Sequence, residues 1–247
     1  MKIPVFISLV LGASIAMGLQ AAPPEGYKLK WSDEFKGSKV DQSKWAYRTD
    51  SKHWSTQKPE NVVVEKGSLV LLLKKEEAGD KHYTGGGVIS KPAFRFGYYE
   101  TRFRVVAGKG WHSSFWMMGH DGSGGTGTKS TALELDVIEN DSINLTSYGV
   151  NTHKWQGEHT SHGHKNVDMT SLADFHVFGC EYTPTTVTYF LDGTAVQTVD
   201  VSQLPHGDLN IWLTSIASHL GKTDAVDESR LPGRVEYEYV RFYEKSK

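Results

Sequence analysis

The chain has 247 residues, with 27 Lys and Arg against 29 Asp and Glu, a hydrophobic share of 38% and a single cysteine. This composition supplies enough apolar residues for a packed core and excludes an intrinsically disordered chain. A formal net charge of -2 argues against a nucleic-acid partner, and a lone Cys180 excludes both an intrachain disulfide and a zinc site built on thiolates.

The first 22 residues predict a signal peptide. Lys2 is followed by an almost uncharged apolar run over residues 3–19, and small residues at 16–22 offer a cleavage site. A membrane anchor is the alternative, but the run is at the short end for a spanning helix and no basic cluster follows it. We therefore expect cleavage, a single domain over residues 23–247, no membrane span after cleavage, and a secreted or periplasmic location.

From residue 24 onward, short runs rich in Val, Thr, Tyr, Phe and Trp alternate with turn signals, as expected of strands. Residues 186–190 and 235–240 alternate apolar and polar side chains, and no stretch keeps a helical period for more than about two turns. Strands are expected in these runs: Val62–Val64, Leu69–Leu73, Gly97–Val106, Phe115–Met118, Leu133–Ile138, Val177–Tyr182, Thr186–Leu191, Ala195–Val201, Asn210–Ser215 and Val235–Tyr243. Many short strands without intervening helices predict an all-β fold, an antiparallel sandwich or barrel, with no second domain.

Two polar segments interrupt this pattern. Gly119–Ser130 is rich in Gly, Ser and Thr and predicts a polar loop. His153–His164 contains four histidines, which are potential metal ligands, but their spacing matches no zinc motif and no set of Asp and Glu ligands accompanies them. We therefore expect a polar surface loop at this second segment, and no metal site.

The most informative stretch is Leu133–Glu139, which places three carboxylates in an apolar, strand-forming run. Side chains alternate between the faces of a strand, so Glu134 and Asp136 share one face and Glu139 falls on the other. One extra residue at Val137–Ile138, a β-bulge, would return Glu139 to the face of the other two, and bulges are common beside active sites.

The spacing of the two glutamates, about four strand steps apart on one face, indicates a type of catalysis. Their α-carbons would lie ~13 Å apart at ~3.3 Å per step, and inward-leaning side chains would bring the carboxylates to about 5–6 Å. This is the separation in a retaining glycosidase, where one carboxylate attacks and the other donates a proton. Asp136, between them, would drive their pKa values apart. The alternatives are an exposed acidic strand, which the apolar residues between the acids disfavour, and a calcium cluster, which prefers flexible loop oxygens.

Aromatic residues flank the acidic run on both sides. Trp111 and Trp116 precede it, and His153 and Trp155 follow it. Flat side chains with a polar edge suit sugar rings, which present C–H faces and a rim of hydroxyls, although any single Trp is equally well explained as a core residue. We therefore expect these four residues to bind substrate. Neither Tyr182 nor Trp212 is assigned, since each fits the core as well as a sugar subsite.

Together these features resemble glycoside hydrolase family 16 (GH16), a group of endo-acting β-glycanases. The motif Glu-x-Asp-x-x-Glu over residues 134–139 is similar to the bulged form of the family signature in its laminarinase, agarase and carrageenase branches. The resemblance covers nearly the whole chain in blocks that follow the family's order: Trp31–Phe35, Gly67–Leu69, Gly86–Ser90, Phe96–Phe103, Gly110–Trp116, Asp174–Gly193 and Glu238–Tyr243.

The resemblance implies a β-jelly-roll sandwich, concanavalin A-like, made of two curved antiparallel sheets with an open concave cleft. By the same match, Glu134 is the nucleophile, Asp136 its electrostatic helper and Glu139 the general acid/base. Trp111 and Trp116 would line subsites on the non-reducing side of the scissile bond.

The match also bears on a histidine, on calcium and on specificity. His153 resembles the histidine that bulged members place beside the acids. Many members hold a structural calcium near a closing-strand Asp, where Glu238 stands here; the resemblance allows that ion, but we expect no cofactor. Asn151–Trp155 departs from the aromatic-Gly pattern of the glucanase branch, which leaves the sugar open.

Three functions stay open from the sequence. The first is a secreted retaining endo-β-glycanase that hydrolyses a β-glucan or β-galactan by double displacement. The second is an endo-β-galactosidase acting on host O-glycans or poly-N-acetyllactosamine. The third is a non-catalytic carbohydrate-binding module, which is disfavoured because all three acids are present. The expected partner is a polysaccharide or oligosaccharide, and the expected state is a monomer.

Overall fold

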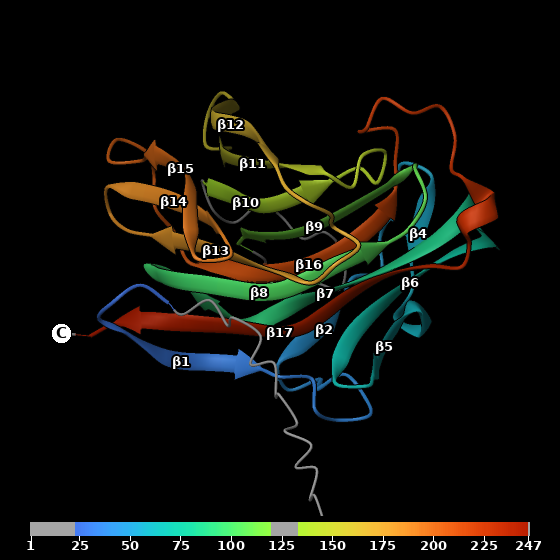
Figure 1. Ribbon diagram of the computed structural model, residues 1–247, viewed down its shortest axis with the longest axis horizontal. Helices are drawn as coiled ribbons and strands as arrows, with labels where there is room; N and C mark the ends of the chain where they lie inside the picture. Colours follow the sequence, from blue (N-terminus) through green and yellow to red (C-terminus); the bar gives the residue numbers. More distant parts are fainter. Residues whose placement is uncertain (1–22, 120–132, 247) are drawn as a thin grey trace, which may run out of the picture.

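The computed structural model describes residues 23–119 and 133–246, so the expected signal peptide and most of the expected loop Gly119–Ser130 lie outside the described residues. The regular structure of the described residues consists of strands and two short 3-10 turns, Pro59–Asn61 and Glu228–Arg230 (Figure 1). None of the helices in these ranges is long and apolar enough to cross a membrane. The prediction of an all-β fold is confirmed.

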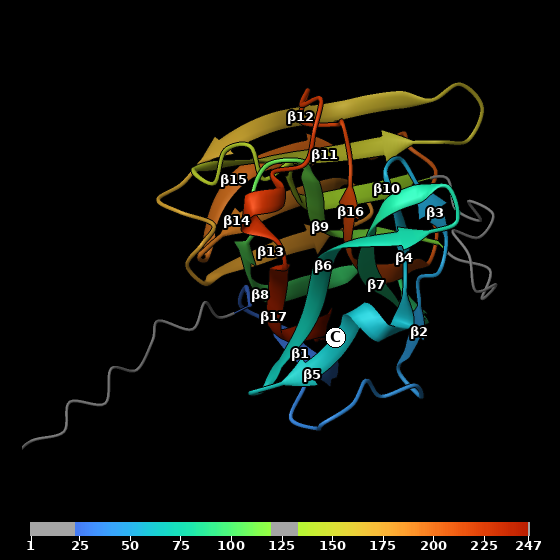
Figure 2. The ribbon, with the colours of Figure 1, turned by 90° about the vertical axis from the view of Figure 1, so that its right-hand side faces the viewer.

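One sheet, which we call the cleft sheet, carries the acidic run on a central strand. Its strands follow one another in space in the order β12 (Thr160–Asp168), β11 (Ser147–Lys154), β10 (Leu133–Asn140), β9 (Trp111–Met118), β16 (Leu209–Ala217), β7 (Lys81–Phe94) and β2 (Trp45–Tyr47). Figure 2 shows β11 and β12 at one extreme of the molecule, and β1 and β5 at the other.

The second sheet, the back sheet, packs behind the first. Its order is β15 (Thr194–Asp200), β14 (Thr186–Leu191), β13 (His176–Tyr182), β8 (Gly97–Val106) and β17 (Gly233–Lys245), whose outer edge is shared by β1 (Tyr27–Asp33) and β6 (Ser68–Ala78), with β5 (Val62–Glu65) beside β6. All of these pairings are antiparallel.

Strand β7 joins the two sheets. It pairs with β16 and β2 in the cleft sheet and with β6 at the edge of the back sheet, so the described strands wrap nearly into a barrel. Two short strands, β3 (Ser51–Lys52) and β4 (Ser55–Gln57), form a hairpin at one end of β7, and β4 pairs with β7 in parallel. The first strand of this hairpin lines the cleft that the acidic run faces.

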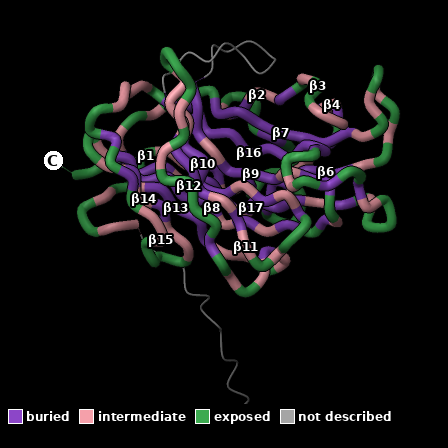
Figure 3. The backbone as a smooth tube through the Cα atoms, turned by 90° about the horizontal axis from the view of Figure 1, so that it is seen from above, coloured by how far each residue is buried: buried purple, intermediate pink, exposed green. Residues whose placement is uncertain are grey.

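The core lies between the sheets and is rich in aromatic rings. The most deeply buried strands, among them β9 and β16, run through the centre of the molecule in Figure 3, with exposed turns at the periphery. Phe103 and Phe178 of the back sheet meet edge to face at 5.7 Å, and each fully buried ring of this size contributes about 2–3 kcal/mol to the free energy of folding.

Two buried tyrosine hydroxyls of the back sheet hydrogen-bond across the core. Tyr237 donates to the carbonyl of Ser114 on β9 at 3.0 Å, and Tyr189 donates to the carbonyl of Asn151 on β11. These bonds fix the strands on both sides of β10 relative to the back sheet. Strand β10 is therefore held between two anchored neighbours.

The histidine-rich segment His153–His164 is only in part the expected surface loop. Residues 155–159 form the connection, but the two ends of the segment belong to β11 and β12, which form an antiparallel hairpin at the edge of the cleft sheet. The prediction of a loop is wrong for these ends because the histidines and other polar residues hide the strand pattern, while the partner strand supplies the backbone hydrogen bonds.

Candidate active site

The predicted β-bulge is present on β10. In the pairing with β9, Asp136 lies opposite Trp116 and Ile138 lies opposite Phe115, so Val137 is the extra residue. The pairing with β11 shifts at the same place. The ladder is therefore interrupted at one residue only, as a β-bulge requires.

The bulge brings all three acids to one side of the sheet. Val137 and Ile138 both pack into the core, whereas Glu134, Asp136 and Glu139 all line a cleft of about 390 Å³ on the opposite face. Strict alternation would have directed Glu139 into the core. One surplus apolar residue thus decides where the third carboxylate points.

Strand β9 supplies the neighbouring row of the cleft, and here one prediction fails. The side chains of His112, Ser114 and Trp116 line the cleft, because they alternate along β9. Trp111 lies on the other face and is fully buried in the core against Tyr83. The prediction that Trp111 binds sugar is wrong: residues 111 and 116 differ by an odd number and cannot share a face of a regular strand.

Trp116 does reach the cleft, stacked on a residue that the sequence left unassigned. Its ring lies 4.5 Å from that of Trp212 on β16, at an interplanar angle of 26°. Trp116 Nε1 donates to Thr214 Oγ1 at 3.0 Å, and Trp212 Nε1 donates to the carbonyl of Met118 at 3.0 Å. Both rings are thus fixed and form a flat apolar wall of the cleft.

Glu134 is held from the β11 side. Trp155 Nε1 donates to Glu134 Oε2 at 2.7 Å, a charge-assisted hydrogen bond. The indole ring is itself stacked on His159 at 3.9 Å. Trp155 therefore orients the carboxylate and also lines the cleft.

Asp136 is almost fully buried between the two glutamates. It is 2% exposed, and its Oδ2 lies 3.2 Å from His153 Nε2. Burial, with the charges of Glu139 and Glu134, raises the pKa of Asp136 well above its usual value. This shift disfavours a third negative charge in the cleft.

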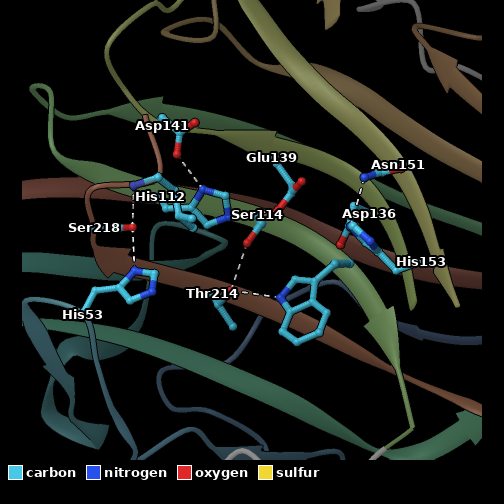
Figure 4. Close-up of polar contacts among 12 residues, drawn as sticks. His53, His112, Ser114, Asp136, Glu139, Asp141, Asn151, His153, Thr214 and Ser218 are labelled. Atoms are coloured by element: carbon cyan, nitrogen blue, oxygen red, sulfur yellow. Dashed lines mark hydrogen bonds and ion pairs between the residues drawn. The ribbon is translucent and has the colours of Figure 1, made fainter. Parts of the chain in front are cut away.

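Glu139 has a partner that sequence reasoning missed. His112 Nε2 lies 3.1 Å from Glu139 Oε1, and His112 Nδ1 lies 2.7 Å from Asp141 Oδ1 (Figure 4). Burial opposes the charged imidazole, but the two carboxylates outweigh it and raise the pKa of His112 to about 9. Burial alone would likewise raise the pKa of Glu139, yet the hydrogen bond from His112 and the nearby charges of His112, His153 and His164 hold it below its usual value. The signal in the sequence was the alternation 112, 114, 116 on one strand face.

The wall built by the segment after β2 carries both signs of charge. Arg48 is 4% exposed and binds Asp50 through two hydrogen bonds, of 2.6 and 3.0 Å. Its guanidinium also lies 5.9 Å from the ring of Trp212. Lys52 lines the same cleft. The cleft therefore has no strong excess of positive charge.

Two places bear on metal binding. Glu134, Asp136 and His153 bring ligand atoms within 4.8 Å of one another, but Trp155 already donates to Glu134, and the side-chain amide of Asn151 contacts His153 Nε2 at 3.0 Å. At the position where the resemblance allowed calcium, the guanidinium of Arg102 already binds the carboxylate of Glu238. That carboxylate does not fit a calcium site.

Comparison with known proteins agrees with this geometry. Residues 28–244 match the family model described as the GH16 domain of β-porphyranases A–D. A β-glucanase of Rhodothermus marinus is 25% identical over 96% of this chain and 92% of its own length. β-Porphyranase B of Phocaeicola plebeius is 31% identical over 71% of this chain and 70% of its own.

Solved structures share the fold. SCLam, a non-specific endo-β-1,3(4)-glucanase of GH16, superposes with a TM-score of 0.78 at 25% identity, over 91% of this chain and 93% of its own. A mutant of SCLam, with a TM-score of 0.79, holds a 1,3-β-D-cellobiosyl-glucose at its active site. The predicted jelly-roll fold is confirmed, and the chain belongs to glycoside hydrolase family 16 as an endo-acting glycoside hydrolase.

Proposed function

We propose that this protein is a secreted, retaining endo-β-glycanase that cleaves internal bonds of a β-galactan or β-glucan by double displacement. The observation that carries the proposal is the single bulge at Val137, which puts Glu134 and Glu139 in one cleft with different partners. Trp155 donates to the first glutamate, and His112 contacts the second. Different environments are what two carboxylates need to play two roles.

In this mechanism Glu134 attacks the anomeric carbon while Glu139 protonates the glycosidic oxygen, and the leaving sugar departs. Water, deprotonated by Glu139, then attacks the glycosyl-enzyme and frees Glu134. Asp136, whose pKa is raised by burial, supports Glu134 from its buried position between the two glutamates.

The proposed sugar contacts come from rings in the cleft. Trp116, backed by Trp212, offers a flat apolar surface for the C–H face of a sugar. We also propose contacts with Trp155 and with His153, whose Nε2 lies beside Asp136.

A galactan of the porphyran type is the first candidate substrate, because the matching family model is that of porphyranases and the porphyranase relative is 31% identical. A β-1,3(4)-glucan is the second, supported by the β-glucanase relative and by the sugar bound to SCLam. The mixed charge of the cleft favours a neutral or weakly charged polysaccharide, which supports the glucan over a heavily sulfated galactan.

A substrate panel tests the proposal. Porphyran, agarose, laminarin, lichenan, carrageenan and mucin O-glycans are incubated with the wild type and with Glu134→Gln, Glu139→Gln and the exposed control Glu77→Gln. We expect oligosaccharides from one polysaccharide, a loss of at least about 1,000-fold in both cleft variants, and normal activity in the control. Proton NMR of the first product should show the β anomer. Release of the α anomer would reject retention, and an unaffected Glu134→Gln variant would reject the assignment of the site.

Secretion rests on the N-terminal sequence, a lysine followed by the apolar run over residues 3–19. Expression of the full chain in a Gram-negative bacterium, followed by mass analysis of the exported protein, should give a chain starting near Pro23. Retention of the full-length chain in the cytoplasm would contradict this part of the proposal. We further propose that residues 23–247 act as a single catalytic domain and as a monomer, which gel filtration with light scattering would test.

A further inference from the structure

His112 occupies a position in the cleft that the two-glutamate mechanism does not explain. Its imidazole bridges Glu139 and Asp141 at 3.1 and 2.7 Å, and the side chain is 12% exposed. Glu139 must hold a proton to act as an acid, yet it sits beside a group that prefers to be a cation. The two side chains therefore compete for one proton, which can lie on either His112 or Glu139.

Asp141 is placed so that it holds the imidazole. It follows β10 directly, where the side chain of Asn140 accepts from the amide of Ser142 at 2.8 Å and fixes the turn. The segment after β16 packs tightly against Asp141. Only a glycine fits there, because a Cβ added at Gly221 would lie 2.5 Å from the Cβ of Asp141. Asp141 accepts from Nδ1, which leaves Nε2 directed at Glu139 (Figure 4).

The charged groups around Glu139 come from four strands and three connecting segments. They are His112 on β9, Glu134 and Asp136 on β10, Asp141 after β10, His153 on β11, His164 on β12, and His53 and His219 at the far side of His112. Burial, followed by the charges of His219, Lys52 and His112, lowers the pKa of His53. His112 is the group in this set that contacts both Glu139 and a second carboxylate.

We propose that His112, oriented by Asp141, is a positioning residue that stores the proton which Glu139 donates to the glycosidic oxygen, so that acid catalysis persists at a pH where an isolated carboxyl would be ionised. The proposal rests on the proposed function. In the resting cleft the proton is on His112 Nε2 and Glu139 is a carboxylate. Transfer along the 3.1 Å contact leaves a neutral imidazole and a neutral carboxyl, without any other reactant.

The proton balances over one turnover. Glu139 gives its proton to the leaving oxygen as the glycosidic bond breaks, and becomes a carboxylate beside a neutral His112. In the second step it takes a proton from water as the water attacks, and returns it to His112. Because the two groups titrate as a unit, the alkaline limb of the pH–rate profile reports the loss of their shared proton.

The first test needs no substrate. In protein labelled with ¹⁵N-histidine, the signal lost in His112→Gln is assigned to His112 and titrated by NMR. We expect it to stay protonated up to about pH 9, and the titration midpoint to fall by about one pH unit or more in Asp141→Asn, which removes one negative partner. Titration near the ordinary value for histidine, unchanged in Asp141→Asn, would overturn the proposal.

The second test is the pH dependence of kcat/KM on the polysaccharide identified by the panel. The alkaline limb should move toward acid by about 1–3 units in His112→Gln and by about 1 unit in Asp141→Asn. The matched control is His176→Gln on the back sheet, where His176 Nδ1 contacts Asp192 at the same 2.7 Å, and its limb should not move. Uniform loss of activity without a shifted limb would show that His112 only supports the fold. If the wild type cleaves no polysaccharide, the proposed function fails, and the NMR titration still decides whether His112 holds the proton.

Discussion

Replacing Glu100 by glutamine should stabilise this protein at pH 8 far more than at pH 5. Glu100 lies on β8 in the back sheet and is 0% exposed. Neither of its carboxylate oxygens has a hydrogen-bond partner among the described residues, and Arg241 Nη1 lies 3.7 Å from Oε1 while that guanidinium also binds Glu34. Burial, opposed only in part by Tyr239 and Arg241, raises the pKa of Glu100 to about 7.

The sign follows from which state holds the proton. Below the ordinary value of 4.5 the carboxyl is neutral in both the folded and the unfolded chain. Between 4.5 and about 7 the unfolded chain ionises while the folded one resists, so stability is lost as the pH rises through this window. A difference of about 2.5 units corresponds to about 3 kcal/mol in total, of which about 2.5 kcal/mol falls between pH 5 and pH 8. Glutamine keeps the shape of the side chain and carries no titrating group.

Urea unfolding at pH 5 and pH 8, with the exposed Glu77→Gln as control, measures this difference. The free energy of unfolding of Glu100→Gln relative to the wild type should rise by about 2–3 kcal/mol between the two pH values, and that of the control should not change. If the free energy of unfolding of the variant differed from that of the wild type by the same amount at both pH values, the reasoning would be refuted. The buried carboxyl would then be ionised at no cost in stability.

Three further substitutions test the cleft and the core. Trp155→Phe removes the donor to Glu134 and should lower kcat about 10–100-fold in steady-state kinetics; an unchanged kcat would mean that this hydrogen bond does not orient the carboxylate. Trp116→Ala removes the half-buried ring of the stacked pair, which lines the cleft, and should raise KM about 10-fold with a smaller effect on kcat, whereas a pure kcat effect would exclude a role in sugar binding. Gly179→Ala places a methyl group against the hydroxyl of Tyr98 and should destabilise the fold by about 1–3 kcal/mol in urea unfolding; full stability would show that the tyrosine can move aside.

Much of the fold follows from local patterns in the sequence. Alternation over 186–190 and 235–240 marks β14 and β17, and both strands are present. The bulge is also predictable, because only an extra residue at Val137 lets three acids share one face of a strand whose other residues are apolar.

The site is harder to predict than the strands, because the register of strand pairing decides which side chains meet in the cleft. The odd spacing of Trp111 and Trp116 already separates them on a regular strand, but composition alone favours both as sugar-binding rings. His112 and Asp141 are 29 residues apart in the chain and meet only when β9 pairs with β10. The role of Trp212 likewise depends on the pairing of β16 with β9, which places its ring beneath Trp116.

Rescue by azide tests the central claim about Glu134 and Glu139 most directly. The variants Glu134→Gly and Glu139→Gly are given 2,4-dinitrophenyl β-glycosides of the oligosaccharide that the wild type releases, with and without sodium azide. A nucleophile and an acid/base on one face predict an α-glycosyl azide from Glu134→Gly and a β-glycosyl azide from Glu139→Gly, because azide replaces the missing carboxylate in the first case and the attacking water in the second. The same azide anomer from both variants, or hydrolysis by Glu134→Gly at the wild-type rate, would contradict the account.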